Sequence, residues 1–366
     1  MGFVGDRLRL ARHFRGLTQR DLGDVVTGSP ALISQIEGGR RPTDDLHAAL
    51  AHALGFEPEF FLDPVEDEFR EEECSFRRRA STPAHLRHRA LAHGTLVGMV
   101  VQYLNVRLKL PPYDVPRLPV RRLDDAEAVA RECREHWKLD LDAPLARVGR
   151  VLERAGVPLA QLDAGTEKVD AFSRRGPVSM IVLNTTKRST SRTLFDIAHE
   201  AGHLAMHEEQ PLRTPERERE ADRFAAAFLL PADQFAREIR TVARLTWEHL
   251  FELKQRWRTS VAMMIYRAHD LGLLDAVQFR QFYKAIYKRG WHRGEPQEPE
   301  AEQPELLQLA FAELAKRGET PADVARALHW KAETLEEVIG GGVAETRAVE
   351  ASSVVPISQY RDRVAL

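Results

Sequence analysis

Cysteine and long hydrophobic segments are scarce in this sequence. The chain has 366 residues and only two cysteines, Cys74 and Cys133, which are far apart. So few cysteines exclude a disulfide framework and a cysteine-rich zinc site, and they are typical of the reducing cytoplasm, where we expect this protein to act. No run approaches eighteen apolar residues, so we predict no membrane span and no membrane partner.

The sequence also has little excess of either charge sign, with a formal net charge of only −2. The charge is nevertheless uneven along the chain. Residues 64–73 are acidic, whereas Arg77–Arg122 contains ten Lys and Arg residues and one acid. A helix is predicted there from Thr82-Pro83 toward Lys109. It is either a connecting helix whose charges are solvated or pair with acidic neighbours, or a helix that contacts a DNA backbone or holds an acidic partner.

The motif with the most specific chemistry is H-E-x-x-H at residues 199–203. In a helix His199 and His203 leave the same side one turn apart, so both imidazoles can bind one Zn²⁺. Glu200 lies beside them and can accept a proton from an attacking water. Two such histidines can also simply line a core helix, so context matters. The apolar run Val178–Asn184 predicts a buried strand, which we expect to pair with an extended substrate.

A third ligand should come from the next predicted helix, which begins at Thr214-Pro215 and ends before Pro231. On that helix we choose Glu220 as the metal ligand, giving a His₂Glu site with one open position. Glu216 and Glu218 are predicted to form a solvated acidic first turn that suits the helix dipole.

These residues carry a resemblance to a known family. HEAGHLAMH followed by EADRFAAAFLLP resembles the ImmA/IrrE family of zinc endopeptidases, which read HELGHLxxH and then EAN/DxFAAxLLMP. The similar block spans about residues 148–294. The resemblance implies a zincin-like fold, zinc bound by His199, His203 and Glu220, and Glu200 as general base. Ala201 stands where the family usually has leucine, which puts no ligand in doubt.

His207 is part of the same family pattern. A straight helix could hardly bring it to the metal as a third ligand, because it lies eight residues after His199. We predict that it supports the ligands or contacts the substrate. His207 and Tyr266 are both candidates for stabilising the oxyanion, and the sequence does not choose between them.

Residues 3–62 contain several short helical patterns joined by tight turns, which favours a helix-turn-helix arrangement. The segments LTQRDLG, SPALISQIEGGRRPT and LAHALGF resemble the Cro/repressor-type (XRE) DNA-binding module, in which the third helix lies in the major groove. The resemblance implies groove contacts by Ser29, Pro30, Ala31, Ser34 and Gln35, and contacts with phosphates or nearby bases by Gln19, Arg40 and Arg41. The alternative is a partner-binding or dimerisation domain, since the segment is slightly acidic overall.

We therefore predict a mainly α protein with a small β-sheet. An all-α helix-turn-helix domain at 1–63 precedes an acidic linker and basic helical connector at 64–122. A zincin-like α+β metallopeptidase domain follows at 123–294. A Pro/Glu-rich linker and small helical tail occupy 295–366, with a mobile segment from Gly341.

The predicted function is that of a transcription regulator with a zinc endopeptidase that hydrolyses a regulatory protein, by expectation a repressor. We expect a homodimer that binds an operator-like inverted repeat in double-stranded DNA. One alternative is a transcription factor whose peptidase fold is a non-proteolytic, metal-dependent sensor. Another is a partner-binding module, for instance in a toxin–antitoxin pair. The intact Glu200 favours proteolysis, because a structural zinc site needs no general base.

Overall fold

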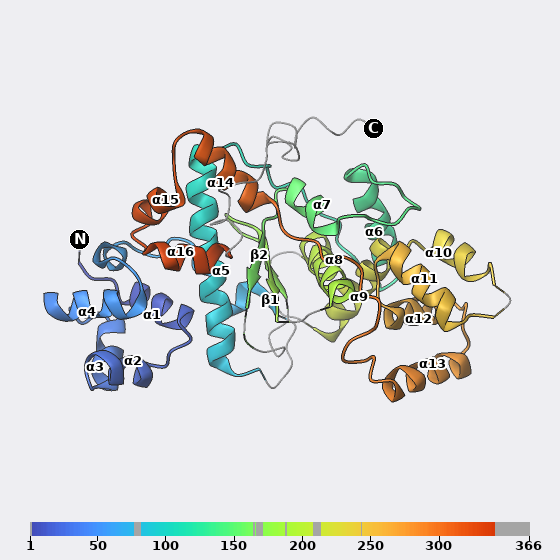
Figure 1. Ribbon diagram of the computed structural model, residues 1–366, viewed down its shortest axis with the longest axis horizontal. Coiled ribbons are helices and arrows are strands. Elements are labelled where there is room, and N and C mark those ends of the chain that lie inside the picture. The colour runs from blue at the N-terminus through green and yellow to red at the C-terminus, as the bar shows by residue number, and fades with distance from the viewer. Residues whose placement is uncertain are drawn as a thin grey trace.

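The computed structural model describes residues 2–76, 82–163, 165, 171–186, 189–207, 214–242 and 244–340. This part of the chain is mostly helical and carries one small sheet, which confirms the predicted fold class (Figure 1). The segment from Gly341 that was expected to be mobile lies outside the described residues. None of the helices in the described part combines the length and apolar character that a membrane crossing requires.

Four short helices form the N-terminal domain: α1 (Gly5–Phe14), α2 (Gln19–Val26), α3 (Pro30–Glu37) and α4 (Asp44–Leu54). Local signals set their ends. Thr18 caps α2 in a capping box with Asp21, and Ser29 caps α3. Thr43 caps α4, which stops at Gly55 with a φ of 79°. These helices confirm the arrangement predicted from the sequence.

The sheet has four strands in the order β1-β3-β4-β2: β1 (Cys74–Phe76), β2 (Leu159–Leu162), β3 (Phe172–Arg174) and β4 (Met180–Asn184). β4 pairs parallel with β2 and antiparallel with β3, while β1 pairs antiparallel with the outer side of β3. The buried strand predicted at Val178–Asn184 is therefore present as β4. Its predicted pairing with a substrate is wrong, because both edges of β4 are already bonded within the sheet.

The helix predicted after Thr82-Pro83 is α5 (Ala84–Arg107), a core helix whose Arg87 and Arg107 pair with Glu71 and Glu319. It packs against α1 and β2, and most of its side chains from Ala90 to Leu104 are buried. Figure 1 shows α5 standing between the N-terminal helices and the sheet. Segment 64–122 thus supplies both a core helix and strand β1.

The C-terminal helices α14 (Leu306–Lys316), α15 (Pro321–Ala327) and α16 (Ala332–Ile339) return to the N-terminal domain (Figure 1). Trp330 is buried, with its ring 6.2 Å from that of Phe56. Arg15 donates a hydrogen bond of 2.7 Å to Thr334. The predicted tail therefore shares one hydrophobic core with the helix-turn-helix domain and α5.

The remaining helices are α6 (Asp125–His136), α7 (Val148–Arg154), α8 (Thr190–Met206), α9 (Pro215–Leu229), α10 (Ala232–Ile239), α11 (Trp247–Trp257), α12 (Val261–Asp270) and α13 (Ala276–Lys288). Two short 3₁₀ helices, η1 (Pro58–Leu62) and η2 (Glu71–Glu73), follow the N-terminal domain. Helices α6 to α9 share a second core, and α10 to α13 share a third.

The segment predicted as a Pro/Glu-rich linker from residue 295 packs against three of these helices. The carboxylates of Glu295, Glu298 and Glu302 accept backbone N–H groups at the starts of α12, α8 and α7. Buried Lys254 lies between Glu295 and Glu298, at 2.9 and 2.7 Å. Acidic groups at helix N-termini satisfy unpaired donors and complement the dipole, so the glutamates have a structural role that composition alone does not reveal.

Candidate metal centre and the exposed face of helix α3

Helices α8 and α9 carry the candidate metal centre and approach each other closely. Gly202, inside the H-E-x-x-H motif, makes this approach possible. A Cβ at that position would lie 2.8 Å from Cδ1 of Phe224 on α9, which is shorter than a normal contact. The glycine thus allows side chains of α9 to reach the histidines of α8.

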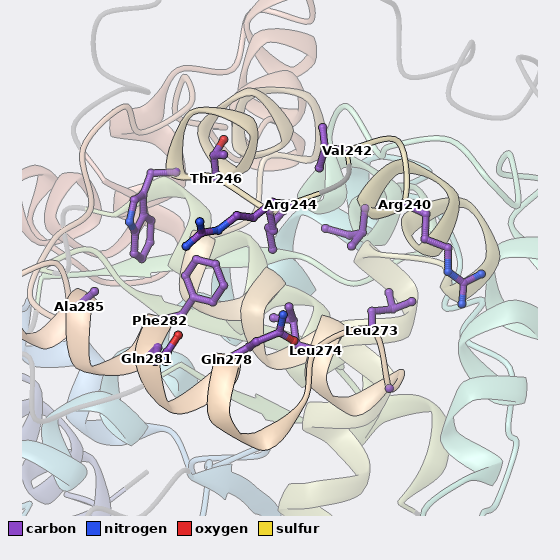
Figure 2. Close-up of a pocket in the computed structure, with 14 residues that line it drawn as sticks. Arg240, Val242, Arg244, Thr246, Leu273, Leu274, Gln278, Gln281, Phe282 and Ala285 are labelled. Carbon is purple, nitrogen blue, oxygen red and sulfur yellow. The ribbon is translucent and has the colours of Figure 1, made fainter.

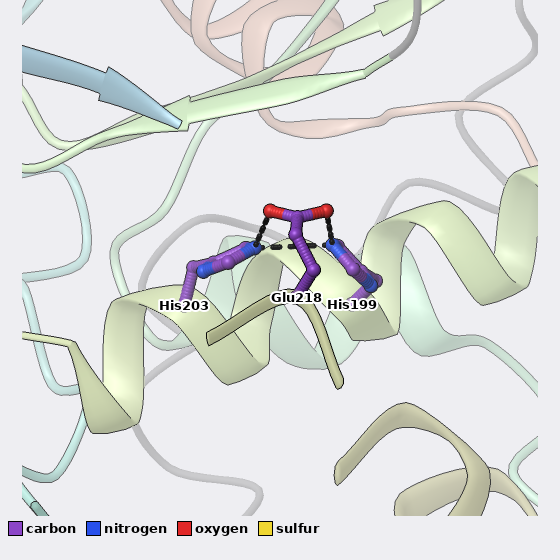
Figure 3. A group of neighbouring side chains, drawn as sticks. All are labelled: His199, His203 and Glu218. Carbon is purple, nitrogen blue, oxygen red and sulfur yellow. Dashed lines mark hydrogen bonds and ion pairs between the residues drawn. The ribbon is translucent and has the colours of Figure 1, made fainter. Parts of the chain in front are cut away.

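Three side chains converge on one point, as Figure 3 shows: His199 and His203 from α8 and Glu218 from α9. The two Nε2 atoms are 3.0 Å apart, and the Glu218 oxygens lie 3.7 Å from His199 Nε2 and 3.4 Å from His203 Nε2. Tetrahedral zinc with N ligands at about 2.0–2.1 Å needs donors roughly 3.3 Å apart. The donor set and its spacing therefore fit a zinc ion.

The structure places a different acid of α9 at the histidines than the Glu220 predicted as the third ligand. Glu218, which was expected to be solvated, faces the histidines, whereas Glu220 contacts His207. Two residues apart on a helix correspond to a rotation of about 200°, so Glu218 and Glu220 cannot point the same way. Glu216 is exposed and pairs with Arg219 at 3.1 Å, in keeping with the solvated first turn predicted for it.

The predicted general base, Glu200, is 1% exposed and lies between α8 and the sheet. Its Oε2 accepts a hydrogen bond of 2.6 Å from Ser173 Oγ on β3. Sequence reasoning missed Ser173, because no local spacing signals a contact between a strand and a helix 27 residues away.

The Nδ1 atoms of both histidines point away from the convergence point and toward further polar groups. His199 Nδ1 is 2.9 Å from an oxygen of Asp222, four residues after Glu218 on the same face of α9. His203 Nδ1 is 2.8 Å from Nδ1 of His207, whose Nε2 is 2.9 Å from Glu220. Burial raises the pKa of the Glu220 carboxyl.

The other oxyanion candidate, Tyr266, is 53% exposed on α12. It lies near Tyr283 of α13, where burial raises the pKa of the Tyr283 hydroxyl to about 12. This position of Tyr266 does not by itself support a catalytic role.

An open pocket of about 770 Å³ lies between α13 and the segment that joins α10 to α11. Figure 2 shows Arg240, Arg244 and Phe282 among the side chains around it. It shares no lining residue with the candidate metal centre. We therefore assign it no part in the proposed chemistry.

Helix α3 has a buried face and an exposed face. Ile33 and Ile36 are completely buried, which fixes the helix on its domain. The predicted groove residues Pro30, Ala31, Ser34 and Gln35 are exposed, and Ser29 caps the helix. Arg40 and Arg41 are exposed as well, and Arg40 hydrogen-bonds the Gln35 side chain. This face can approach a ligand without rearrangement of the core.

Gln19, at the start of α2, is tied to the end of α3. Its Nε2 donates a hydrogen bond of 2.7 Å to Glu37. Arg12 also binds Glu37, at 2.6 Å, and both charged side chains are nearly buried. These contacts set the position of α2 relative to α3.

Comparison with protein-family models gives two matches. Residues 4–59 match a helix-turn-helix domain, and residues 152–269 match an IrrE N-terminal-like domain of peptidase family M78. The first match covers α1 to α4, and the second covers β2, β3, β4 and both helices of the candidate metal centre. Strand β1 and helix α5 lie outside both matches. Comparison with curated proteins finds no match to the chain.

Proposed function

Because the chain combines a helix-turn-helix domain with an IrrE N-terminal-like peptidase domain, we propose that it is a DNA-binding regulator that hydrolyses a peptide bond in a regulatory protein, with zinc as cofactor. The observation that carries this proposal is the convergence of His199, His203 and Glu218 beside the buried carboxylate of Glu200. A structural zinc site would need the first three residues and not the fourth.

In the proposed reaction His199, His203 and Glu218 hold the metal through two Nε2 atoms and one carboxylate. When bound, zinc supplies Lewis-acid polarisation of the scissile carbonyl and a lowered pKa for the attacking water. Glu200 accepts the proton of that water and delivers it to the leaving amine. Ser173 holds one oxygen of Glu200 by a hydrogen bond, which orients the carboxylate for this transfer.

The DNA-binding part of the proposal concerns the exposed face of α3. Pro30, Ala31, Ser34 and Gln35 would contact base edges, and Arg40 and Arg41 would contact phosphates or nearby bases. Modules of this type commonly act as two-fold dimers, so we propose a homodimer on an inverted repeat with half-sites about 10 base pairs apart. A transcriptional repressor is the proposed protein substrate.

A second candidate function is a metal-dependent sensor that cleaves nothing. The observation that favours it is the burial of Glu200, which is 1% exposed and engaged by Ser173. A carboxylate this enclosed needs a local rearrangement before it can meet a substrate, whereas a sensor needs no such access.

The test compares wild type, Glu200→Gln and Glu218→Ala in the native host. Glutamine keeps the size of Glu200 but cannot accept a proton at neutral pH, so Glu200→Gln should keep zinc and fold while losing about a hundredfold to ten-thousandfold in hydrolysis. Two readouts are needed: transcription from the target promoter and fragments of co-purifying proteins.

Proteolysis is the function if a partner stays uncut in Glu200→Gln and the transcriptional response is lost with it. The sensor function replaces it if Glu200→Gln responds normally while Glu218→Ala, which disturbs the metal itself, does not.

A further inference from the structure

The two candidate ligand histidines differ in the hydrogen-bond partner of Nδ1, the ring nitrogen that points away from the metal position. His199 Nδ1 meets a carboxylate directly, at 2.9 Å from Asp222. His203 Nδ1 instead meets Nδ1 of His207 at 2.8 Å, and His207 Nε2 meets the Glu220 carboxylate at 2.9 Å. An imidazole is thus inserted between ligand and carboxylate on one side of the site only.

The hydrogen bonds of this second arrangement can run in only one direction if His203 binds metal through Nε2. A neutral His203 that offers its Nε2 lone pair carries its proton on Nδ1. That proton is donated to His207 Nδ1, which must accept and therefore carries no proton. The single proton of a neutral His207 is then on Nε2, from which it is donated to Glu220. Each tautomer in the series determines the next.

We propose that His207 and Glu220 are positioning residues that set the ring orientation and tautomer of His203 and so raise the affinity of the site for zinc. The proposal rests on the zinc site put forward above. It assigns neither residue as a ligand. His207 faces the Nδ1 side of His203, and the candidate ligand atoms all lie on its Nε2 side.

The location of His207 and Glu220 explains how they can orient the ring of His203. His207 is the C-cap that directly follows α8, and Glu220 lies on α9, so the pair joins the two helices that supply the ligands. Both side chains are largely buried, with 8% and 15% of their surfaces exposed. Burial limits competition from water for these hydrogen bonds.

The test measures zinc dissociation constants of the full-length protein by competition with a chromophoric chelator. The variants are His207→Phe, Glu220→Ala and the double variant, with Glu216→Ala as a matched control from the exposed face of α9. We expect His207→Phe and Glu220→Ala each to weaken zinc binding about tenfold to a hundredfold, as is usual for outer partners of metal-bound histidines. Glu216→Ala should leave the affinity unchanged.

Because Glu220 would act through His207, the double variant should bind zinc no more weakly than His207→Phe alone. His207→Gln should restore part of the affinity, since an amide can both accept and donate a hydrogen bond. The melting temperature of the zinc-free variants separates this role from simple bridging of the helices. A purely structural bridge would lower that temperature without changing the affinity.

Several outcomes overturn the proposal. These are unchanged affinity in His207→Phe, additive losses in the double variant, or complete loss of zinc in His207→Phe of the kind expected for His203→Ala, which would make His207 a ligand. Absence of zinc from the wild type would refute the proposed zinc peptidase itself, and the positioning role with it.

Discussion

Helix α3 and the helix pair α8–α9 present their candidate functional side chains in opposite ways. On α3, Ser34 and Gln35 are exposed, and the Gln35 side chain hydrogen-bonds Arg40 from the same short segment of chain. On α8 and α9, His199 and His203 are nearly buried, and the carboxylates that face them, Asp222 and Glu218, come from the other helix. The spacing within one helix predicts which exposed side chains share a face. Which buried side chains meet depends on how two helices are rotated against each other.

The largest effect is expected on zinc binding when Glu218, rather than Glu220, is replaced. Wild type should contain close to one zinc per chain. Glu218→Ala should weaken zinc binding by more than about a hundredfold, because loss of a ligand should exceed the tenfold to hundredfold loss typical of an outer partner. Binding to DNA should be unaffected, since α3 lies in a different core. Metal analysis and a DNA-binding titration test both statements.

The opposite order, with Glu220→Ala losing zinc and Glu218→Ala retaining it, would contradict the geometry of α9 in this structure. Glu216→Ala again serves as the control on the same helix.

A second prediction concerns pH and the core beneath the DNA-binding domain. His93 of α5 is 2% exposed, and burial lowers its pKa from 6.5 to about 4. Between pH 6.5 and about 4, His93 of the unfolded chain therefore binds a proton that His93 of the folded protein does not bind. The free energy of unfolding therefore keeps its full value above pH 6.5. It decreases as the pH falls toward 4, by about 3 kcal/mol for this residue.

Denaturant titrations between pH 7 and 4 measure this loss. His93→Leu should flatten the decline, whereas His52→Leu, at an exposed position, should not. His13 and His88, whose rings stack between α1 and α5 at 4.5 Å, should add a loss of the same sign, since burial lowers the pKa of each. An equal slope in wild type and His93→Leu would exclude His93 as the cause.

A third prediction compares two helical glycines. Gly202→Ala should destabilise the protein by about 1–3 kcal/mol, because the new Cβ would meet the Phe224 ring at 2.8 Å. In Gly98→Ala the nearest new contact is 3.6 Å from Phe69, an ordinary distance, so a stabilisation of about 0.5–1 kcal/mol is expected. Thermal unfolding measures both. Gly202→Ala should also weaken zinc binding, and a tolerated Gly202→Ala would show that α9 can move away.

The smallest effect is expected on the exposed face of α3. Ser34→Ala combined with Gln35→Ala should weaken specific DNA binding roughly tenfold, or about 1.4 kcal/mol, and change nonspecific binding less. Zinc content should not change. Titrations of a selected site and of random DNA give the comparison. Equal losses on both DNAs would argue against Pro30–Glu37 as the helix that reads the sequence.

The N-terminal domain could be predicted well because its signals are local. Thr18, Ser29 and Thr43 each accept the backbone N–H three residues further on and so cap the helix that follows directly. The linker predicted from residue 295 was wrong for the opposite reason. Its proline and glutamate content is typical of a solvated segment, but its glutamates bind the N-termini of helices up to 153 residues away.

The sequence by itself determined the positions of the helices, the mainly helical class and the two domain types. It also put His199 and His203 on one face of α8, because their spacing matches one turn of a helix. These properties depend on periodicity and on caps within a few residues, which the order of the amino acids states directly.

Only the tertiary structure decided which acid of α9 faces those histidines, what holds Glu200, and where β1 and the C-terminal helices belong. Each depends on the rotation and packing of elements far apart in the chain. Glu218 and Glu220 have the same chemistry and nearly the same position in the sequence. The rotation of α9 against α8, made possible by the close approach at Gly202, directs one to His199 and His203 and the other to His207.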